Sequence, residues 1–96
     1  MSFTHIVTFK WREQEFADQP IAEALRNLIP SLDGVQDYVC GPDIDLTPSS
    51  YDFAVVGTFD SREAFAAYRD DTEHQRILNE MIVPHLDRRT VVQLQN

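Results

Sequence analysis

Hydrophobic and polar side chains alternate over the first eleven positions. From Phe3 to Trp11 every second residue is aromatic, valine or histidine, and most residues between them are polar. This period of two predicts a β-strand with one face directed at the core. The same reasoning, with the turn residues that separate the segments, predicts three further strands at Val35–Cys40, Tyr51–Phe59 and Arg89–Leu94.

Two other segments follow the helical period. Between Pro20 and Pro30, the apolar residues Ile21, Leu25, Leu28 and Ile29 recur at offsets of four, seven and eight, which predicts an amphipathic helix. Asp18 precedes this segment as a candidate N-cap, and Pro20 suits its first turn.

The segment Ser61–Val83 is also predicted to be helical, but not as one straight rod. Tyr68 and His74 are six positions apart, which separates them by ~120° on a regular helix. The two apolar stripes therefore face one core only if the helix breaks near Asp70-Asp71. Thr72, followed by Gln75, is the predicted N-cap of the second piece, and Asp60 followed by Glu63 resembles a capping box at the start.

The resulting order is β-α-β-β-α-β over one domain, residues 1–96. This order predicts an α+β fold of the ferredoxin-like type, a four-stranded antiparallel sheet with both helices on one face. The strand Tyr51–Phe59 is apolar on both faces. With no residues left to cover the second sheet face, a homodimer is predicted.

Composition narrows the function without naming it. Of the 96 residues 16 are acidic and 8 basic, giving a net charge of −8, which disfavours nucleic acid as a partner. The short apolar runs predict no membrane-spanning segment, and no signal-peptide pattern is present. The single cysteine, Cys40, excludes an internal disulfide framework. We therefore expect a cytoplasmic protein.

Three residues are candidates for acid–base chemistry. His5 shares the inward face of the first strand, and His74 and Tyr68 lie on the apolar stripes of the broken helix. Because all three side chains are predicted to point inward, they are expected to line one pocket. Histidine titrates close to neutral pH, so they are predicted to act there as catalytic groups. The alternative is that both histidines are polar core residues bonded to backbone carbonyls. His85, beside Pro84, is expected in a surface loop.

A metal site at the same place is the weaker alternative. His5 and His74 would need a carboxylate such as Asp71 or Glu73, and the sequence has no His-x-x-x-His or Glu-x-x-His spacing. We expect neither a metal nor another cofactor.

Four stretches together resemble one known family. They are His5–Phe9, Ile29–Val35, Tyr51–Phe59 and Ser61–Tyr68 with His74 after it. In their order and spacing they are similar to the stress-responsive dimeric α/β-barrel (Dabb) family over nearly the whole chain. The resemblance implies a ferredoxin-like subunit whose open sheet face packs against a second copy.

The resemblance also implies a range of functions. One plant member is a polyketide cyclase, whose tyrosine and histidine correspond to Tyr68 and His74 and whose N-terminal histidine corresponds to His5. Gln93 stands where many members have Asp. The expected function is binding of a small hydrophobic or polyketide-like molecule, with acid–base chemistry of the cyclase, lyase or isomerase type. The alternatives are a non-catalytic stress-associated dimer and a cofactor-free monooxygenase. The residues expected to contact the ligand are Phe9, Phe65 and Leu78.

Overall fold

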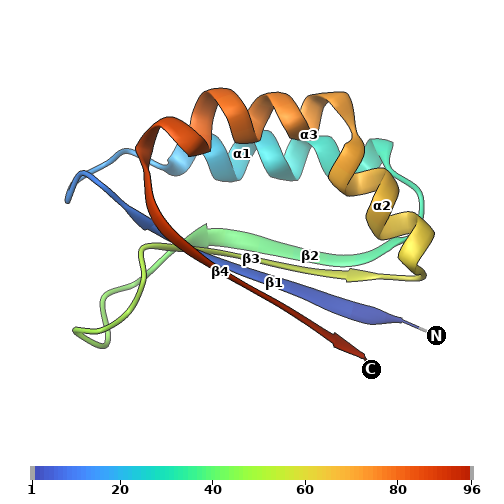
Figure 1. The fold of residues 1–96 in the computed structure, drawn as a ribbon, viewed down its shortest axis with the longest axis horizontal. Coiled ribbons are helices and arrows are strands. Elements are labelled where there is room, and N and C mark those ends of the chain that lie inside the picture. The colour runs from blue at the N-terminus through green and yellow to red at the C-terminus, as the bar shows by residue number, and fades with distance from the viewer. Residues whose placement is uncertain (1, 96) are drawn as a thin grey trace.

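Residues 2–95 form four strands and three α-helices in the predicted order (Figure 1). The structure is a computed structural model that describes residues 2–95. The strands pair in the order β2-β3-β1-β4, and every pair is antiparallel. This is the predicted ferredoxin-like α+β arrangement. The elements are β1 (Phe3–Trp11), α1 (Gln19–Leu28), β2 (Val35–Pro42), β3 (Phe53–Phe59), α2 (Arg62–Asp70), α3 (Thr72–Ile77) and β4 (Leu86–Gln95).

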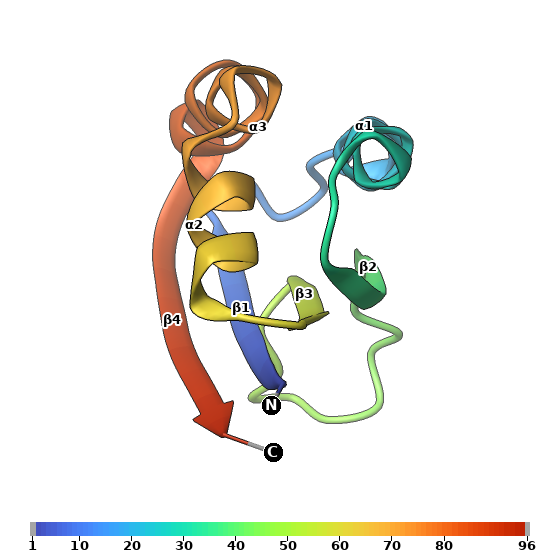
Figure 2. The ribbon, with the colours of Figure 1, turned by 90° about the vertical axis from the view of Figure 1, so that its right-hand side faces the viewer.

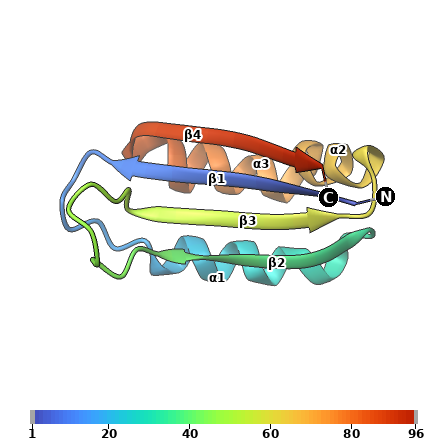
Figure 3. The same cartoon turned by 90° about the horizontal axis from the view of Figure 1, so that it is seen from below.

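The helices cover one face of the sheet and leave the other face bare. Figure 2 shows α1, α2 and α3 on the same side of the strands, and Figure 3 shows the uncovered face in front of them. Alternation along β1 places His5, Val7 and Phe9 on the covered face. That face therefore forms the core and any pocket within the subunit.

Strand boundaries agree with the predictions at β1 and differ by one to three residues elsewhere. The strand β3 begins at Phe53 rather than Tyr51. Just before it, the Asp52 carboxylate accepts a hydrogen bond of 2.8 Å from the backbone N–H of Trp11, and the Asp52 N–H donates to the carbonyl oxygen of Phe9. The last strand is longer than predicted. It begins directly after His85 and pairs with β1 along nearly its whole length.

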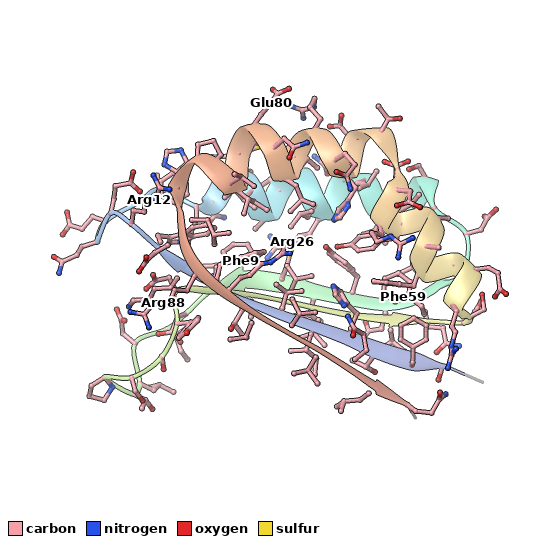
Figure 4. The ribbon with its side chains drawn as sticks, in the orientation of Figure 1. Phe9, Arg12, Arg26, Phe59, Glu80 and Arg88 are labelled. Atoms are coloured by element: carbon pink, nitrogen blue, oxygen red, sulfur yellow. The ribbon has the colours of Figure 1, made fainter. Side chains whose placement is uncertain are left out.

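The core lies between the sheet and α1 and α3. Phe9 and Phe59 point from the sheet toward the helices, whereas Glu80 points away from it (Figure 4). Burying such apolar side chains supplies most of the drive for folding. The largest fully buried side chains are Phe53, Phe59, Ile21, Leu25, Ile77 and Ile82.

The first helix begins as predicted, but Asp18 does not cap it. Asp18 occupies the N-cap position without a side-chain capping bond. Its carboxylate instead accepts a hydrogen bond of 2.9 Å from the indole N–H of Trp11. A buried indole needs an acceptor, and this tertiary contact takes the carboxylate away from the helix.

The break in the second helical segment falls where the phase argument places it. α2 ends at Asp70 and α3 begins at Thr72. Both predicted caps are wrong by one residue: the Ser61 hydroxyl accepts from the N–H of Ala64 at 3.1 Å, and the Asp71 carboxylate accepts from the N–H of His74 at 3.0 Å. Ser and Asp satisfy helix N-termini in the same way as Thr, so sequence preference alone did not select between neighbours.

After α3 the chain continues as a π-helical segment, Leu78–Ile82, and a 3-10 turn, Val83–His85. His85 therefore lies at a helix end rather than in an open loop. Its ring stacks on Phe16 at 4.0 Å between centroids. Among residues 2–95, no helix combines the length and apolar character needed to cross a membrane.

The turn into β2 depends on Gly34. This residue has a φ of +82°, and a Cβ there would lie 2.5 Å from the Cβ of Ala64 on α2. Only glycine meets both conditions without strain. The close approach holds α2 against the end of the sheet, next to the residues described below.

Candidate functional site

A cavity of about 430 Å³ lies between the covered sheet face and the helices. Every α-helix and the three strands β1, β3 and β4 contribute to its wall. Its size suits a small organic ligand, because the pockets that bind such ligands usually enclose a few hundred cubic ångströms. The apolar wall consists of Val7, Phe9, Leu25, Val55, Phe65, Leu78, Ile82 and Val91, and the polar wall of His5, Tyr68, Arg69, His74, Arg89 and Gln93.

His74 is held at this cavity by the start of α3. The Asp71 cap fixes its backbone, and its side chain is 7% exposed. The ring Nδ1 lies 3.2 Å from the backbone oxygen of Arg69. A carbonyl oxygen only accepts, so Nδ1 donates and the neutral ring has its lone pair on Nε2.

That lone pair is available to a ligand. Within residues 2–95, Nε2 of His74 makes no hydrogen bond. In the same part of the chain, no side-chain nitrogen or oxygen is both fully buried and without a hydrogen-bond partner. The atom therefore keeps accessible surface in a residue that lines the cavity. An accessible, unbonded imidazole nitrogen is the group that a general base requires.

His5 has the opposite hydrogen arrangement. It sits on β1 directly across from Gln93 on β4, and the Gln93 amide nitrogen lies 2.9 Å from Nδ1 of His5. An amide nitrogen only donates, so Nδ1 accepts and the neutral His5 ring carries its hydrogen on Nε2. His5 is thus a donor on its second nitrogen where His74 is an acceptor.

Tyr68 connects the histidine to a second phenol. Its ring lies 4.2 Å from the His74 ring and 6.5 Å from the His5 ring, between centroids. Its hydroxyl is 2.8 Å from the hydroxyl of Tyr38. Burial raises the pKa of Tyr68 to about 12, and burial likewise raises the pKa of Tyr38. Both phenols are therefore protonated near neutral pH.

Gly57 makes room for this tyrosine pair. It pairs with Tyr38 on β2 and with His5 on β1. A Cβ at Gly57 would lie 3.1 Å from the ring of Tyr38 and 3.0 Å from that of Phe59. The missing side chain lets the Tyr38 ring lie over the strand and reach Tyr68.

Both histidines are shifted toward their neutral forms. Burial lowers the pKa of His74, opposed by the Arg69 carbonyl and the Asp71 carboxylate. Burial also lowers the pKa of His5, and the charges of His74 and Arg89 lower it further. Desolvation disfavours an imidazolium, so both rings are neutral at pH 7.

The structure brings the six sequence-predicted site residues to one cavity. His5, Tyr68 and His74 line it, as do Phe9, Phe65 and Leu78; their roles toward a ligand stay predictions. The same wall contains Arg69 and Arg89, which the sequence analysis did not select. The alternation of β4 could have indicated Arg89, since it shares a strand face with Val91 and Gln93.

The carboxylates considered for a metal site have other partners. Asp71 caps α3, and Glu73 forms an ion pair of 2.7 Å with Arg76. Among residues 2–95, no group of three or more His, Cys, Asp or Glu side chains is arranged to hold a metal ion. Cys40 is buried, and burial raises the pKa of its thiol, which opposes formation of a reactive thiolate.

Comparison with known proteins identifies relatives along the whole chain. The model of the family described as stress responsive A/B barrel domain (Dabb) matches residues 3–96. A comparison with curated proteins finds no match.

Solved structures match the chain over nearly its full length. A dimeric ferredoxin-like protein of unknown function from Thermobifida fusca is 34% identical, with a TM-score of 0.89 over 100% of this chain and 92% of that chain. A second dimeric ferredoxin-like protein of unknown function, from Jannaschia sp., is 30% identical, with a TM-score of 0.81 over 100% of both chains. The hydroxynitrile lyase from Passiflora edulis shares the fold at 20% identity, with a TM-score of 0.77 over 99% of this chain and 94% of that chain.

Proposed function

Because the chain belongs to the stress responsive A/B barrel domain family, we propose that it acts as a homodimer whose subunits each bind a small, largely apolar organic molecule and transfer a proton on it. The observation that carries this proposal is the unbonded Nε2 of a neutral His74 in the wall of an apolar cavity. His5 and Tyr68 share that wall. An acceptor and two donors around one apolar space are the components of acid–base catalysis.

In the proposed reaction His74 is the base. Its Nδ1–H is engaged by the Arg69 carbonyl, so Nε2 takes a proton from a carbon next to a ligand carbonyl. The same hydrogen bond, together with the charge of Asp71, favours the imidazolium that forms. A base oriented in this way needs no reorganisation at the moment of proton transfer.

The oxygen of the resulting enolate would be stabilised by His5 and Tyr68. Nε2 of His5 carries a hydrogen, and Tyr68 keeps its phenolic proton at neutral pH. When the Tyr38 hydroxyl donates to Tyr68, the Tyr68 hydroxyl is free to donate to the ligand. Phe9, Phe65 and Leu78 would hold the apolar body of the ligand and exclude water, which strengthens these hydrogen bonds.

Several kinds of reaction begin with this step. Aldol-type cyclisations and isomerisations that move a double bond next to a carbonyl begin with this proton transfer, and lyase reactions of the retro-aldol type pass through the same kind of enolate. The hydroxynitrile lyase of the same fold is named for a lyase activity, but that likeness concerns the fold alone. The proposal therefore depends on the cavity of this chain. The cytoplasmic location of the protein stays a prediction.

The dimer is proposed to form through the open sheet face. Val39, Val92 and Leu94 are 60%, 48% and 50% exposed in the single chain. Apolar patches of this kind on a sheet are usually covered by a partner. Two solved relatives, at 34% and 30% identity, are described as dimeric, which supports the same assembly here.

Deuterium uptake from D2O by an enolisable ketone tests the proton transfer. Phenylacetone is a suitable probe because its reactive C–H lies between a ring and a carbonyl. The protein should accelerate exchange, and His74→Gln should lower the catalysed rate by roughly 10²–10⁴-fold, the range for loss of one general base. The control is His85→Gln, which removes an imidazole that is not part of the cavity wall.

The outcomes separate the proposed function from its alternative. Equal catalysed rates for the His74→Gln variant and the unaltered protein would leave His74 as a structural residue. A folded protein that accelerates none of a panel of aryl and alkyl ketones would favour the non-catalytic dimer. An NMR spectrum of each variant shows whether the fold is kept.

A further inference from the structure

Charge is distributed unevenly between the cavity and the rest of the chain. The whole chain has 16 acidic and 8 basic residues. The charged residues in the cavity wall are basic instead: the wall contains Arg69 and Arg89 and none of the acidic residues. A wall of this composition gives the cavity a local positive charge, which attracts anions although the net charge of the protein is negative.

The two arginines differ in how far their charge is compensated. The guanidinium of Arg69 forms hydrogen bonds of 3.0 and 3.2 Å with both carboxylate oxygens of Asp70. For Arg89, no carboxylate lies within ion-pairing distance among residues 2–95. Arg89 therefore supplies the uncompensated positive charge at this cavity.

The strand register directs Arg89 and its neighbour Arg88 to opposite faces. Arg89 pairs with Phe9 of β1, whose side chain faces the helices, and Arg88 pairs with Lys10. Arg88 points away from the helices (Figure 4) and forms an ion pair of 3.7 Å with Asp87. Two adjacent residues of equal charge thus differ in whether they line the cavity.

A neighbouring cavity continues the positive surface. It has a volume of about 530 Å³ and shares Phe65, Arg69 and Gln93 with the first. It adds Arg62 to the wall, and again no acidic residue. The walls of both cavities therefore present arginine and amide donors, and of these arginines Arg69 is paired with Asp70.

We propose that the ligand of this cavity is a small organic carboxylate with an apolar body, and that its carboxylate pairs with Arg89. This inference rests on the proposed function and specifies its substrate class. A guanidinium matches a carboxylate through two parallel hydrogen bonds. The apolar body would lie against Phe9 and Val55, and a carbonyl further along the ligand would lie near His5 and Tyr68.

Phenylacetate and phenylacetamide form a matched pair of probes, because they share their size and apolar body and differ in charge. Binding of each would be followed by NMR through the imidazole resonances of His5 and His74. Phenylacetate should bind at least about tenfold more tightly, the effect of one charge-assisted hydrogen bond. Arg89→Gln should remove this preference, and Arg88→Gln, which changes the net charge equally, should keep it.

Arg89→Gln has a second readout that needs no ligand. The Arg89 charge lowers the pKa of His5 in the free protein, so the variant should raise that pKa, and Arg88→Gln should raise it less. A folded spectrum with this change shows that the Arg89 variant has lost a charge at the cavity rather than its structure.

Each failure has a distinct signature. Equal affinity of the unaltered protein for both probes would overturn the carboxylate assignment and leave the proposed proton transfer intact. An equal loss of preference in Arg88→Gln and Arg89→Gln would overturn it as well, because net charge would then be the cause. If neither probe perturbs the cavity histidines, both the inference and the proposed binding role fail. Selective carboxylate binding by a protein that fails the ketone test would support the inference alone.

Discussion

The two faces of one sheet have different chemistry although the same strands form both. On the covered face β1 presents His5, Val7 and Phe9 beneath the helices, at a cavity with polar groups from three other elements, α2, α3 and β4. On the bare face β1, β3 and β4 present mainly β-branched residues such as Ile6, Val56 and Val92 in one register. The covered face suits a ligand, and the bare face suits another sheet.

The difference shows how a short chain can provide for both proposed roles, ligand binding and dimerisation. Successive side chains of a strand point to opposite faces, so one segment can carry reactive groups on one face and an association surface on the other. A substitution on either face should therefore affect one task and spare the other, provided that the fold survives.

The largest effect is expected on the bare face. Val56→Asp would bury an unpaired carboxylate in the proposed dimer, which is costly, and should weaken dimerisation at least about 100-fold. Light scattering should then report the mass of one chain instead of two. Asn79→Asp adds the same charge at an exposed helical position and should stay dimeric. A folded Val56→Asp dimer would remove the bare face from the interface.

A smaller effect is expected where the covered face is assembled. Asp71→Ala removes the cap of α3 and should lower the free energy of unfolding by about 0.5–2 kcal/mol. Thr72→Ala should change it by less than about 0.5 kcal/mol, because Thr72 is already within the helix. Urea denaturation of both variants measures the contrast. Equal losses would mean that the cap is not assigned to the right residue.

The smallest effect is a dependence of stability on pH that belongs to the covered face. The pKa values of His5 and His74 are lowered in the folded protein, mainly by burial. The unfolded chain therefore binds more protons as the pH falls below about 6.5, and stability decreases in that window.

Urea denaturation at about pH 7.5 and about pH 5.5 would measure this loss. It should be smaller in His74→Gln, which removes one of the two groups, while Val56→Asp, on the bare face, should leave the histidine contribution unchanged. An equal loss in His74→Gln and the unaltered protein would show that His74 does not contribute to the pH dependence.

Local patterns in the sequence are sufficient to predict how side chains are oriented within each element. The alternation from Phe3 to Trp11 predicts that His5 and Phe9 share a face, and the phase slip between Tyr68 and His74 predicts the break between α2 and α3. These are consequences of backbone geometry over a few residues, since a period of two or 3.6 depends only on the local chain.

Contacts between residues far apart in the sequence depend on how the elements pack together. The contacts Gln93–His5 and Tyr38–Tyr68 join residues 88 and 30 positions apart, and they depend on strand register and helix placement. The same packing brings Arg89 to the cavity, gives the Trp11 indole to Asp18 and leaves the cap of α3 to Asp71. No local pattern encodes these partners, because each side chain has several acceptors or donors of equal chemistry and packing chooses among them by distance.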